Sequence, residues 1–387
     1  MKARACLALL TLALAGCDTT SCERSGLDCP GPGSSDVDVV AGVDLAALFA
    51  RPTGAEIEGV LSEWRGGPTP EQQVAFRDVA LYSLGNRESI SVLAGAQADE
   101  SAAVVYAAVR QPPRPAGDVR TLPLVLVLGD TPGADVETMI RDLALPDGLK
   151  DEVVLVFLAY RGGTLRVQGE TYSSGVPADP YAGDGEDAWA LLAYLASRSP
   201  ASTPYDAQRL AIIGHGRGGS VALLEAARAK VRTRAVPRLV LSLAAPASFF
   251  TPTSRFAARQ YLLGNSPGTL PAVESVMQAT AGAVRSGEAT LAEARVGLVR
   301  RSASWFFMPP RLPAPPYIVA AYGEADIVVP IEDGRALDFL TGQPDRGLYF
   351  ELENTGHQSI QANDQVLSTT RAEVCARLFT TPPRACL

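Results

Sequence analysis

Apolar runs recur along the chain and are separated by stretches with helical spacing. The main runs lie at residues 123–128, 153–158, 209–214, 239–243, 317–322 and 348–352. Most of them lack the polar alternation of a half-exposed strand, which is typical of strands buried on both faces. Helical patterns at 185–198 and 218–231 lie between the runs. This alternation predicts an α/β fold with a mostly parallel central sheet and helices on both faces.

The start of the folded region has a helical pattern of its own. Its apolar positions are Leu45, Leu48 and Phe49, followed by Val74, Val79 and Leu84. They predict a helical extension over residues 42–89, at the beginning of one folded domain that covers residues 42–387. Two short strands are expected after it, at residues 90–94 and 103–109.

A second segment breaks the alternation of strands and helices. Residues 248–312 are mostly helical in pattern, are bounded by prolines and end in the aromatic cluster Trp305-Phe306-Phe307. We interpret this segment as a helical insertion. It forms either a lid over a pocket or ordinary crossover helices, and the pattern fits both.

The chain begins with the features of an export signal. Lys2 and Arg4 precede an apolar run at residues 7–14, which is too short to span a bilayer and is followed by small residues. The sequence Leu14-Ala15-Gly16-Cys17 resembles the bacterial lipobox. This resemblance implies that residues 1–16 are removed and that Cys17 carries lipid, whereas the alternative is an ordinary signal peptide. Residues 17–41, rich in Ser, Gly, Asp and Pro, predict a flexible tether.

Export bears on localisation and on the cysteines. We expect the protein to be held by lipid on a bacterial cell membrane, at its periplasmic or cell-surface face. Of six cysteines, Cys6 leaves with the signal and Cys17 takes the lipid, so four remain and allow three pairings. The sequence disfavours a metal site, because it has no CxxC motif and both histidines lie in other motifs. We favour the two local disulfides, Cys22–Cys29 and Cys375–Cys386.

Composition narrows the range of partners. The 387 residues are 47% hydrophobic and carry a formal net charge of -8, and the lysines are Lys2, Lys150 and Lys230. Nucleic-acid-binding proteins usually have a basic face, so we expect no nucleic-acid partner. No G-x-G-x-x-G spacing and no phosphate-binding lysine motif is present, so we expect no cofactor.

The most informative motif follows the apolar run at 209–214. The sequence Gly214-His215-Gly216-Arg217-Gly218-Gly219 resembles the nucleophile elbow of the α/β-hydrolase superfamily, usually G-H-S-x-G-G, in five of six positions. The sixth position, where the nucleophilic serine belongs, is Gly216. The elbow glycines allow close packing of strand and helix, and the backbone N–H of Arg217 would help to bind an oxyanion.

Other motifs occur in the order of the same superfamily. Gly129-Asp130-Thr131-Pro132-Gly133 resembles the oxyanion loop H-G-G-P-G of prolyl-oligopeptidase-like hydrolases, so Asp130 and Thr131 are candidate oxyanion or substrate-binding residues. Residues 322–330 resemble G-x-x-D-x-x-V-P, which implies that Asp326 is the triad acid. Residues 354–358 contain the Gly-His pair that implies His357 as the base. Weaker matches lie at 160–163, 183–187 and 206–209. The chain is therefore identified as similar to the prolyl-oligopeptidase or dienelactone-hydrolase branch.

The roles of these residues depend on the missing serine. Glycine cannot form an acyl-enzyme, and loss of the serine typically costs around 10⁶ in turnover. We expect Asp326 to hold His357 in one tautomer, His215 and Ser220 to be packing residues, and Thr131 to be only a remote substitute nucleophile. One hypothesis is a pseudoenzyme that binds a small ester or peptide ligand, or a protein partner, without turnover. The other is a hydrolase in which His357 and Asp326 activate a water in the space that the serine left empty.

Overall fold

We describe the protein from a computed structural model, which covers residues 38–67, 74–85, 88–96, 103–114, 120–198, 205–232, 236–265, 271–308 and 316–386. The predicted signal peptide 1–16, the lipidation site Cys17 and the cysteines Cys22 and Cys29 lie outside the described residues, as does most of the predicted tether.

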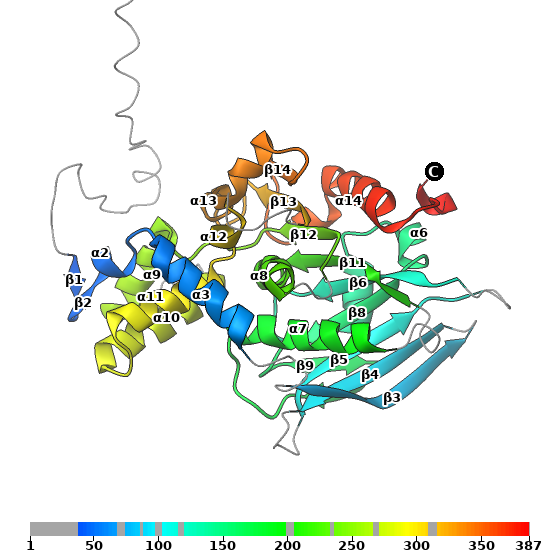
Figure 1. Cartoon of the computed structure of the whole chain (residues 1–387), viewed down its shortest axis with the longest axis horizontal. Helices are drawn as coiled ribbons and strands as arrows, with labels where there is room; N and C mark the ends of the chain where they lie inside the picture. Colours follow the sequence, from blue (N-terminus) through cyan, green and yellow to red (C-terminus); the bar gives the residue numbers. More distant parts are fainter. Residues whose placement is uncertain are drawn as a thin grey trace, which may run out of the picture. The chain divides into compact units, whose positions relative to one another are not determined.

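A mixed sheet of nine strands in the described part of the chain forms the centre of the fold (Figure 1). Its order is β14-β13-β12-β11-β6-β8-β5-β4-β3. The parallel strands are β6 (Leu122–Leu128), β8 (Val154–Ala159), β11 (Tyr205–His215), β12 (Leu239–Leu243), β13 (Tyr317–Gly323) and β14 (Gly347–Leu352). The antiparallel strands are β5 (Ala103–Gln111), β4 (Glu88–Ala96) and β3 (Ala75–Gly85). The predicted α/β class and mostly parallel sheet are therefore confirmed.

The parallel strands are buried on both faces because helices cover both. Along β6, Leu124, Leu126 and Leu128 pack in one core together with α7 (Ala182–Ser197) and α8 (Arg217–Arg232). The alternate residues Val125 and Val127 pack in a second core with α14 (Asp364–Leu378) and α5 (Val136–Asp142). The side chains on both faces of the strand are thus buried among apolar residues, which explains why these runs show no polar alternation.

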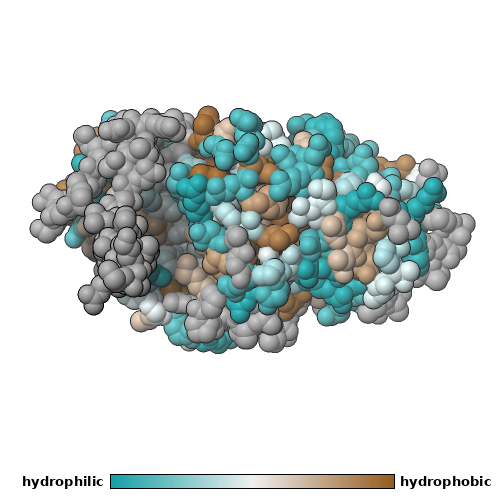
Figure 2. Space-filling model, turned by 90° about the horizontal axis from the view of Figure 1, so that it is seen from above, coloured by the Kyte–Doolittle hydropathy of each residue, from teal (hydrophilic) through white to brown (hydrophobic). Residues whose placement is uncertain are grey.

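The smaller elements lie outside this nine-stranded sheet. They are β1 (Val39–Val40), β2 (Val43–Asp44), β7 (Ala134–Asp135), β9 (Thr164–Val167), β10 (Glu170–Ser173), α6 (Asp147–Lys150), α13 (Ile331–Gly334) and the 3₁₀ helices η1 (Arg335–Gly342), η2 (Ser359–Ala362) and η3 (Arg384–Cys386). A disulfide joins Cys375 on α14 to Cys386 on η3. No helix among the described residues has the length and apolar character needed to cross a bilayer. The face of the molecule in Figure 2 mixes hydrophilic and hydrophobic residues.

The helical prediction for residues 42–89 is wrong in its second half. Helices α2 (Leu45–Leu48) and α3 (Gly54–Gly66) are present, but the chain then enters β3 and the start of β4. Strand β3 lies at the edge of the sheet, and Val79, Leu81 and Leu84 on it are exposed. Its main-chain pairing with β4 therefore decides its conformation, and its side chains carry little of the apolar pattern from which a strand is recognised.

Residues 248–312 contain α9 (Pro252–Leu262), α10 (Pro271–Ser286), α11 (Leu291–Arg301) and α12 (Ser304–Phe307). These helices pack beside α2 and α3 (Figure 1). The rings of Trp64 on α3 and Phe306 on α12 lie 4.5 Å apart between centroids. The N-terminal extension and the segment 248–312 thus form one helical layer.

The hydrogen bonds of Arg295 on α11 connect the two parts of that helical layer. Its guanidinium donates to both carboxylate oxygens of Glu56, at 2.6 and 3.0 Å, and to the carbonyls of Leu48 and Ala50. The side-chain hydrogen bond from Arg295 lowers the pKa of Glu56 to about 2. The folded state therefore gains stability above pH 4.5 from this carboxylate, and it loses that stability as the pH falls through about 2.

We expect Arg295→Met to lower the free energy of unfolding by about 2 kcal/mol, because a half-buried carboxylate and the backbone carbonyls of Ala47, Leu48, Ala50 and Arg51 lose their donor. Arg300→Met is the matched control. Arg300 pairs with Glu63 on the same two helices, but both side chains are largely exposed, so we expect a loss below about 1 kcal/mol. Urea unfolding at pH 7 and pH 3 measures the loss of unfolding free energy in both variants. The difference between these two losses should be smaller at pH 3. Equal losses at pH 7 would contradict the assigned role of Arg295.

Candidate active site

The turn between β11 and α8 has the geometry of a nucleophile elbow. Gly216 is at its apex with φ +53°, in the left-handed region that favours glycine. Its N–H donates to the carbonyl of Leu243 at 2.8 Å, and the helix begins at the next residue. At Gly214, a Cβ would lie 2.1 Å from the carbonyl oxygen of Gly218, so the strand and the helix approach each other too closely for a larger residue. The motif found in the sequence therefore folds as expected.

The space beside Gly216 is filled by Asp130, which follows β6. A Cβ at position 216 would lie only 1.9 Å from Oδ1 of Asp130 and 2.4 Å from its Cγ. The hypothesis of a water in an empty space left by the serine is wrong in this respect, because a carboxylate occupies that space. Oδ1 also accepts a hydrogen bond of 2.9 Å from the backbone N–H of Arg217. The donor expected to bind an oxyanion is thus engaged by the protein's own anion.

The structure brings Asp326 and His357 to the same place. Nδ1 of His357 lies 2.7 Å from Oδ2 of Asp326, and Nε2 lies 3.1 Å from Oδ2 of Asp130. Asp326 is itself fixed, because its Oδ1 accepts from the N–H groups of Val328 and Val329. A single imidazole therefore bridges two carboxylates, one of which stands where the serine hydroxyl was expected.

These contacts favour the charged form of His357. Burial lowers the pKa of His357, but the hydrogen bonds to Asp130 and Asp326 and the charges of these groups outweigh burial and raise it to about 9. Burial raises the pKa of Asp130, but the hydrogen bonds from His357 and from the N–H of Arg217 outweigh burial and lower it. At neutral pH the arrangement is an imidazolium between two carboxylates. His357 then has no lone pair with which to act as a general base.

His215, the residue before Gly216, forms a hydrogen bond with the backbone of His357. Its Nε2 donates to the backbone carbonyl of His357 at 2.8 Å, and its Nδ1 faces the side-chain amide of Gln361 at 3.3 Å. A carbonyl only accepts, so the neutral ring carries its proton on Nε2 and its lone pair on Nδ1. Burial, together with the charge of His357, lowers the pKa of His215.

The two hydroxyls considered as substitute nucleophiles are bonded to backbone carbonyls. Ser220 is fully buried and donates to the carbonyl of Pro246 at 2.7 Å. Thr131 is exposed and donates to the carbonyl of Gly133 at 3.0 Å. These bonds fit a packing role for Ser220 and a loop-stabilising role for Thr131.

The side chain of Arg217 has a role that the sequence did not indicate. Its guanidinium turns away from Asp130 and forms two bonds with the buried carboxylate of Asp184, at 2.6 and 2.7 Å. It also lies over the ring of Tyr160, 4.9 Å from the centroid. Asp184 belongs to the acidic motif at 183–187, whose match to the hydrolase pattern was the available signal. The pair fixes the start of α8, and with it the N–H that binds Asp130.

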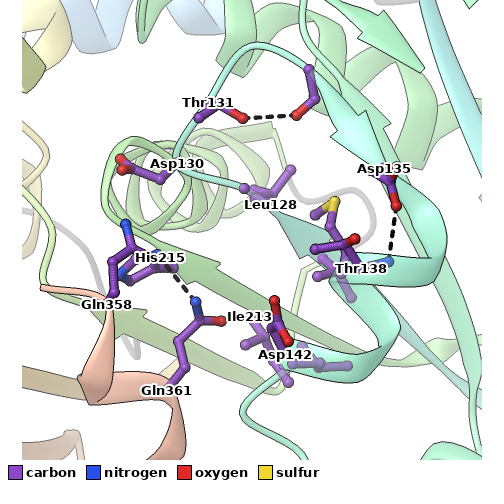
Figure 3. Close-up of a pocket in the computed structure, with 15 residues that line it drawn as sticks. Leu128, Asp130, Thr131, Asp135, Thr138, Asp142, Ile213, His215, Gln358 and Gln361 are labelled. Atoms are coloured by element: carbon purple, nitrogen blue, oxygen red, sulfur yellow. Dashed lines mark hydrogen bonds between the residues drawn. The ribbon is translucent and has the colours of Figure 1, made fainter. Parts of the chain in front are cut away.

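A cavity of about 230 Å³ lies beside this cluster (Figure 3). Its polar wall includes Asp130, Thr131, His215, Gln358 and Gln361. Its apolar wall is formed by Val127, Leu128, Met139, Leu143 and Ile213. The cavity can hold a small ligand that has one apolar and one polar end.

Comparison with known proteins identifies the fold of this chain. No known family profile matches the sequence, and no curated protein matches it. The structure is similar to acetyl xylan esterase 1 from Thermoanaerobacterium sp. JW/SL YS485, with a TM-score of 0.52 and 12% identity over 81% of this chain and 93% of that chain. It is also similar to an acetyl xylan esterase from Paenibacillus sp. R4, with a TM-score of 0.53 and 15% identity over 84% and 97% of the two chains. The fold is the α/β-hydrolase fold. At these identities the similarity concerns the fold alone.

We expect the two histidines to titrate at opposite sides of neutrality. In a metal-free buffer, the NMR signals of the His357 ring should shift with pH, with a midpoint near pH 9. The reason is that Asp130 and Asp326 bind the charged form of the ring. Those of His215 should shift only below its usual value of about 6.5. NMR titration measures both, since the chain has two histidines and His215→Gln assigns them.

The same titration tests the contact with Asp130. Asp130→Asn should lower the midpoint of His357, because one ionised acceptor is lost. Since the folded pKa of His357 is raised, its contribution to stability is complete below pH 6.5 and disappears as the pH rises through about 9. A His357 midpoint at or below 6.5 in the unaltered protein would refute the bridging arrangement.

Proposed function

We propose that this chain is a lipid-anchored pseudoenzyme with an α/β-hydrolase fold, which binds an ester or peptide ligand without serine-type turnover. The observation that carries the proposal is the carboxylate of Asp130 in the volume that a side chain at position 216 would need. A nucleophilic serine and Asp130 in this position exclude each other.

Three features of the site support the absence of acyl transfer. The apex residue has no hydroxyl, the N–H of Arg217 is bonded to Asp130, and His357 is protonated at neutral pH. An oxyanion would have to displace a carboxylate that is held by both Arg217 and His357. Loss of a single oxyanion donor already costs about 10²–10³ in turnover, and here the nucleophile and the base are affected as well.

The alternative hydrolase, in which His357 and Asp326 activate water, requires two changes in this site. Asp130 would have to leave the apex to admit the water, and His357 would have to lose its proton. Each change removes an ion pair from a partly buried place. We therefore favour binding over catalysis, with the cavity beside the cluster as the place for a small ligand.

Acyl-ester groups are the ligand class that we propose to test first. The two solved structures of the same fold are named as acetyl xylan esterases, and their names support an acyl ester only as a starting point. The apolar wall of the cavity, with Val127, Met139 and Leu143, suits a short acyl group. Its polar wall supplies the amides of Gln358 and Gln361 for an ester or peptide carbonyl.

We expect the unaltered protein to form no adduct with a fluorophosphonate probe and to show no hydrolysis of p-nitrophenyl acetate above background. Gly216→Ser alone should stay inactive and lose stability, because its Cβ would lie 1.9 Å from Oδ1 of Asp130. The double change Asp130→Gly with Gly216→Ser frees the space and the N–H of Arg217. It should therefore become labelled and gain at least about 10²-fold over Gly216→Ser in ester hydrolysis.

Two controls accompany this experiment. Asp130→Gly alone should remain unlabelled, since it opens the space without supplying a hydroxyl, and His357→Ala should abolish the gain in the double variant. Stoichiometric labelling of the unaltered protein, or ester turnover that disappears in His357→Ala, would refute the pseudoenzyme. A double variant that folds but stays inactive would refute the view that Asp130 is what blocks the site.

The membrane anchor is a separate part of the proposal, supported by the lipobox-like residues 14–17. In a bacterial host we expect the protein to incorporate labelled fatty acid and to partition into detergent. Cys17→Ala should abolish both. Cys6→Ala, a matched change within the signal peptide, should alter neither. Membrane retention that survives Cys17→Ala would rule out anchoring through this residue.

A further inference from the structure

Three potential metal ligands meet beside the elbow. Asp130, His215 and His357 each present one ligand atom, and these atoms all lie within 4.8 Å of one another. They come from the loop after β6, the end of β11 and the loop after β14, so they do not form a motif that can be recognised in the sequence. We propose that this cluster binds a divalent transition-metal ion of the Zn²⁺ or Co²⁺ type. The inference goes beyond the proposed function, since it adds a ligand that serine chemistry does not use.

The spacing of Asp130 and His357 fits such an ion. Oδ2 of Asp130 and Nε2 of His357 are 3.1 Å apart, with a proton between them. In a tetrahedral zinc site with bonds of about 2.0–2.1 Å, neighbouring ligand atoms lie about 3.3 Å apart. The cation would take the place of this proton, which is released to solvent. Asp130 and His357 would then need to move by only tenths of an ångström.

Asp326 already provides the supporting contact that metal-bound histidines usually have. It accepts the Nδ1 proton of His357 at 2.7 Å, which leaves Nε2 as the ligating nitrogen. Carboxylate–histidine pairs of this kind fix the ring and increase its basicity toward the metal. The backbone N–H groups of Val328 and Val329 hold Asp326 in turn. The ligand is therefore oriented before any ion arrives.

His215 supplies the second imidazole. Its Nε2 donates to the carbonyl of His357, so the lone pair of the neutral ring is on Nδ1. The present partner of Nδ1 is the side-chain amide of Gln361 at 3.3 Å, a long contact that an ion can displace. His215 is 6% exposed, and Asp130 and His215 both line the 230 Å³ cavity. The cavity thus offers an entry path and room for a water as a further ligand.

The charge of the site also favours a divalent cation. The carboxyl groups of Asp130 and Asp326 lie on either side of the ring of His357, 3.1 Å from Nε2 and 2.7 Å from Nδ1. A divalent ion bound at Nε2 would carry a charge opposite to that of both acidic groups. Because His357 and Asp326 are buried, an uncompensated negative charge is costly there, and its compensation is a gain.

The experiment is a titration of the chelator-treated, purified protein with Co²⁺, followed by visible absorption. We expect one equivalent to give the intense bands of a four- or five-coordinate site, and one equivalent of Zn²⁺ to remove them. Asp130→Asn and His215→Gln should each weaken binding at least about tenfold. In His215→Gln the amide can still donate to the carbonyl of His357, so the fold is preserved. Circular dichroism and thermal unfolding verify this.

Two further variants make the result decisive. Asp142→Asn changes a carboxylate that lines the same cavity but lies outside the cluster, so it should bind Co²⁺ as the unaltered protein does. Gln361→Ala removes the competitor for Nδ1 of His215 and should leave the affinity equal or higher. Absence of intense bands, or equal binding by Asp130→Asn and Asp142→Asn, would overturn the proposal. Neither outcome depends on the fluorophosphonate result, so failures of the two proposals are distinguishable.

Discussion

The carboxylate of Asp130 and a side chain at position 216 cannot occupy the same space, and the rest of the site follows from this exclusion. Glycine is the residue that leaves room, and it also suits the left-handed φ of +53°. With the volume free, Asp130 reaches both the N–H of Arg217 and the imidazole of His357. The apex of the turn, the N–H of Arg217 and the ring of His357 therefore all contact the same carboxylate.

Alternating charge explains how so many ionisable groups remain partly buried together. His357 lies between Asp326 and Asp130, and the guanidinium of Arg217 is paired with Asp184. Removal of one member would leave an uncompensated charge, which is more costly than the intact pair. An intact acid and histidine therefore need no catalytic explanation. They hold the loops after β6, β13 and β14 together at the carboxyl ends of three strands.

The sequence predicted the parts of the fold in which local pattern and burial agree. Strands such as β6 and β8 are apolar on both sides because both faces of the sheet are covered. The elbow and the pair Asp326 and His357 were recognisable because each has a short motif. Edge strand β3 was missed, since its stability comes from pairing with β4 rather than from apolar spacing. The contact of Asp130 with Gly216 was missed because it joins positions 86 residues apart and depends on three-dimensional approach.

The two positions at which this chain differs from the hydrolase motifs, 130 and 216, concern the same small volume. In the H-G-G-P-G loop that residues 129–133 resemble, position 130 is glycine, and at the elbow position 216 is serine. Here position 130 is an aspartate and position 216 is a glycine, and Oδ1 of Asp130 lies 1.9 Å from where a Cβ at position 216 would be. The carboxylate of Asp130 therefore occupies the volume that a side chain at position 216 would need. An anion held against an imidazole, with no hydroxyl at the apex of the turn, supports the binding role that we propose.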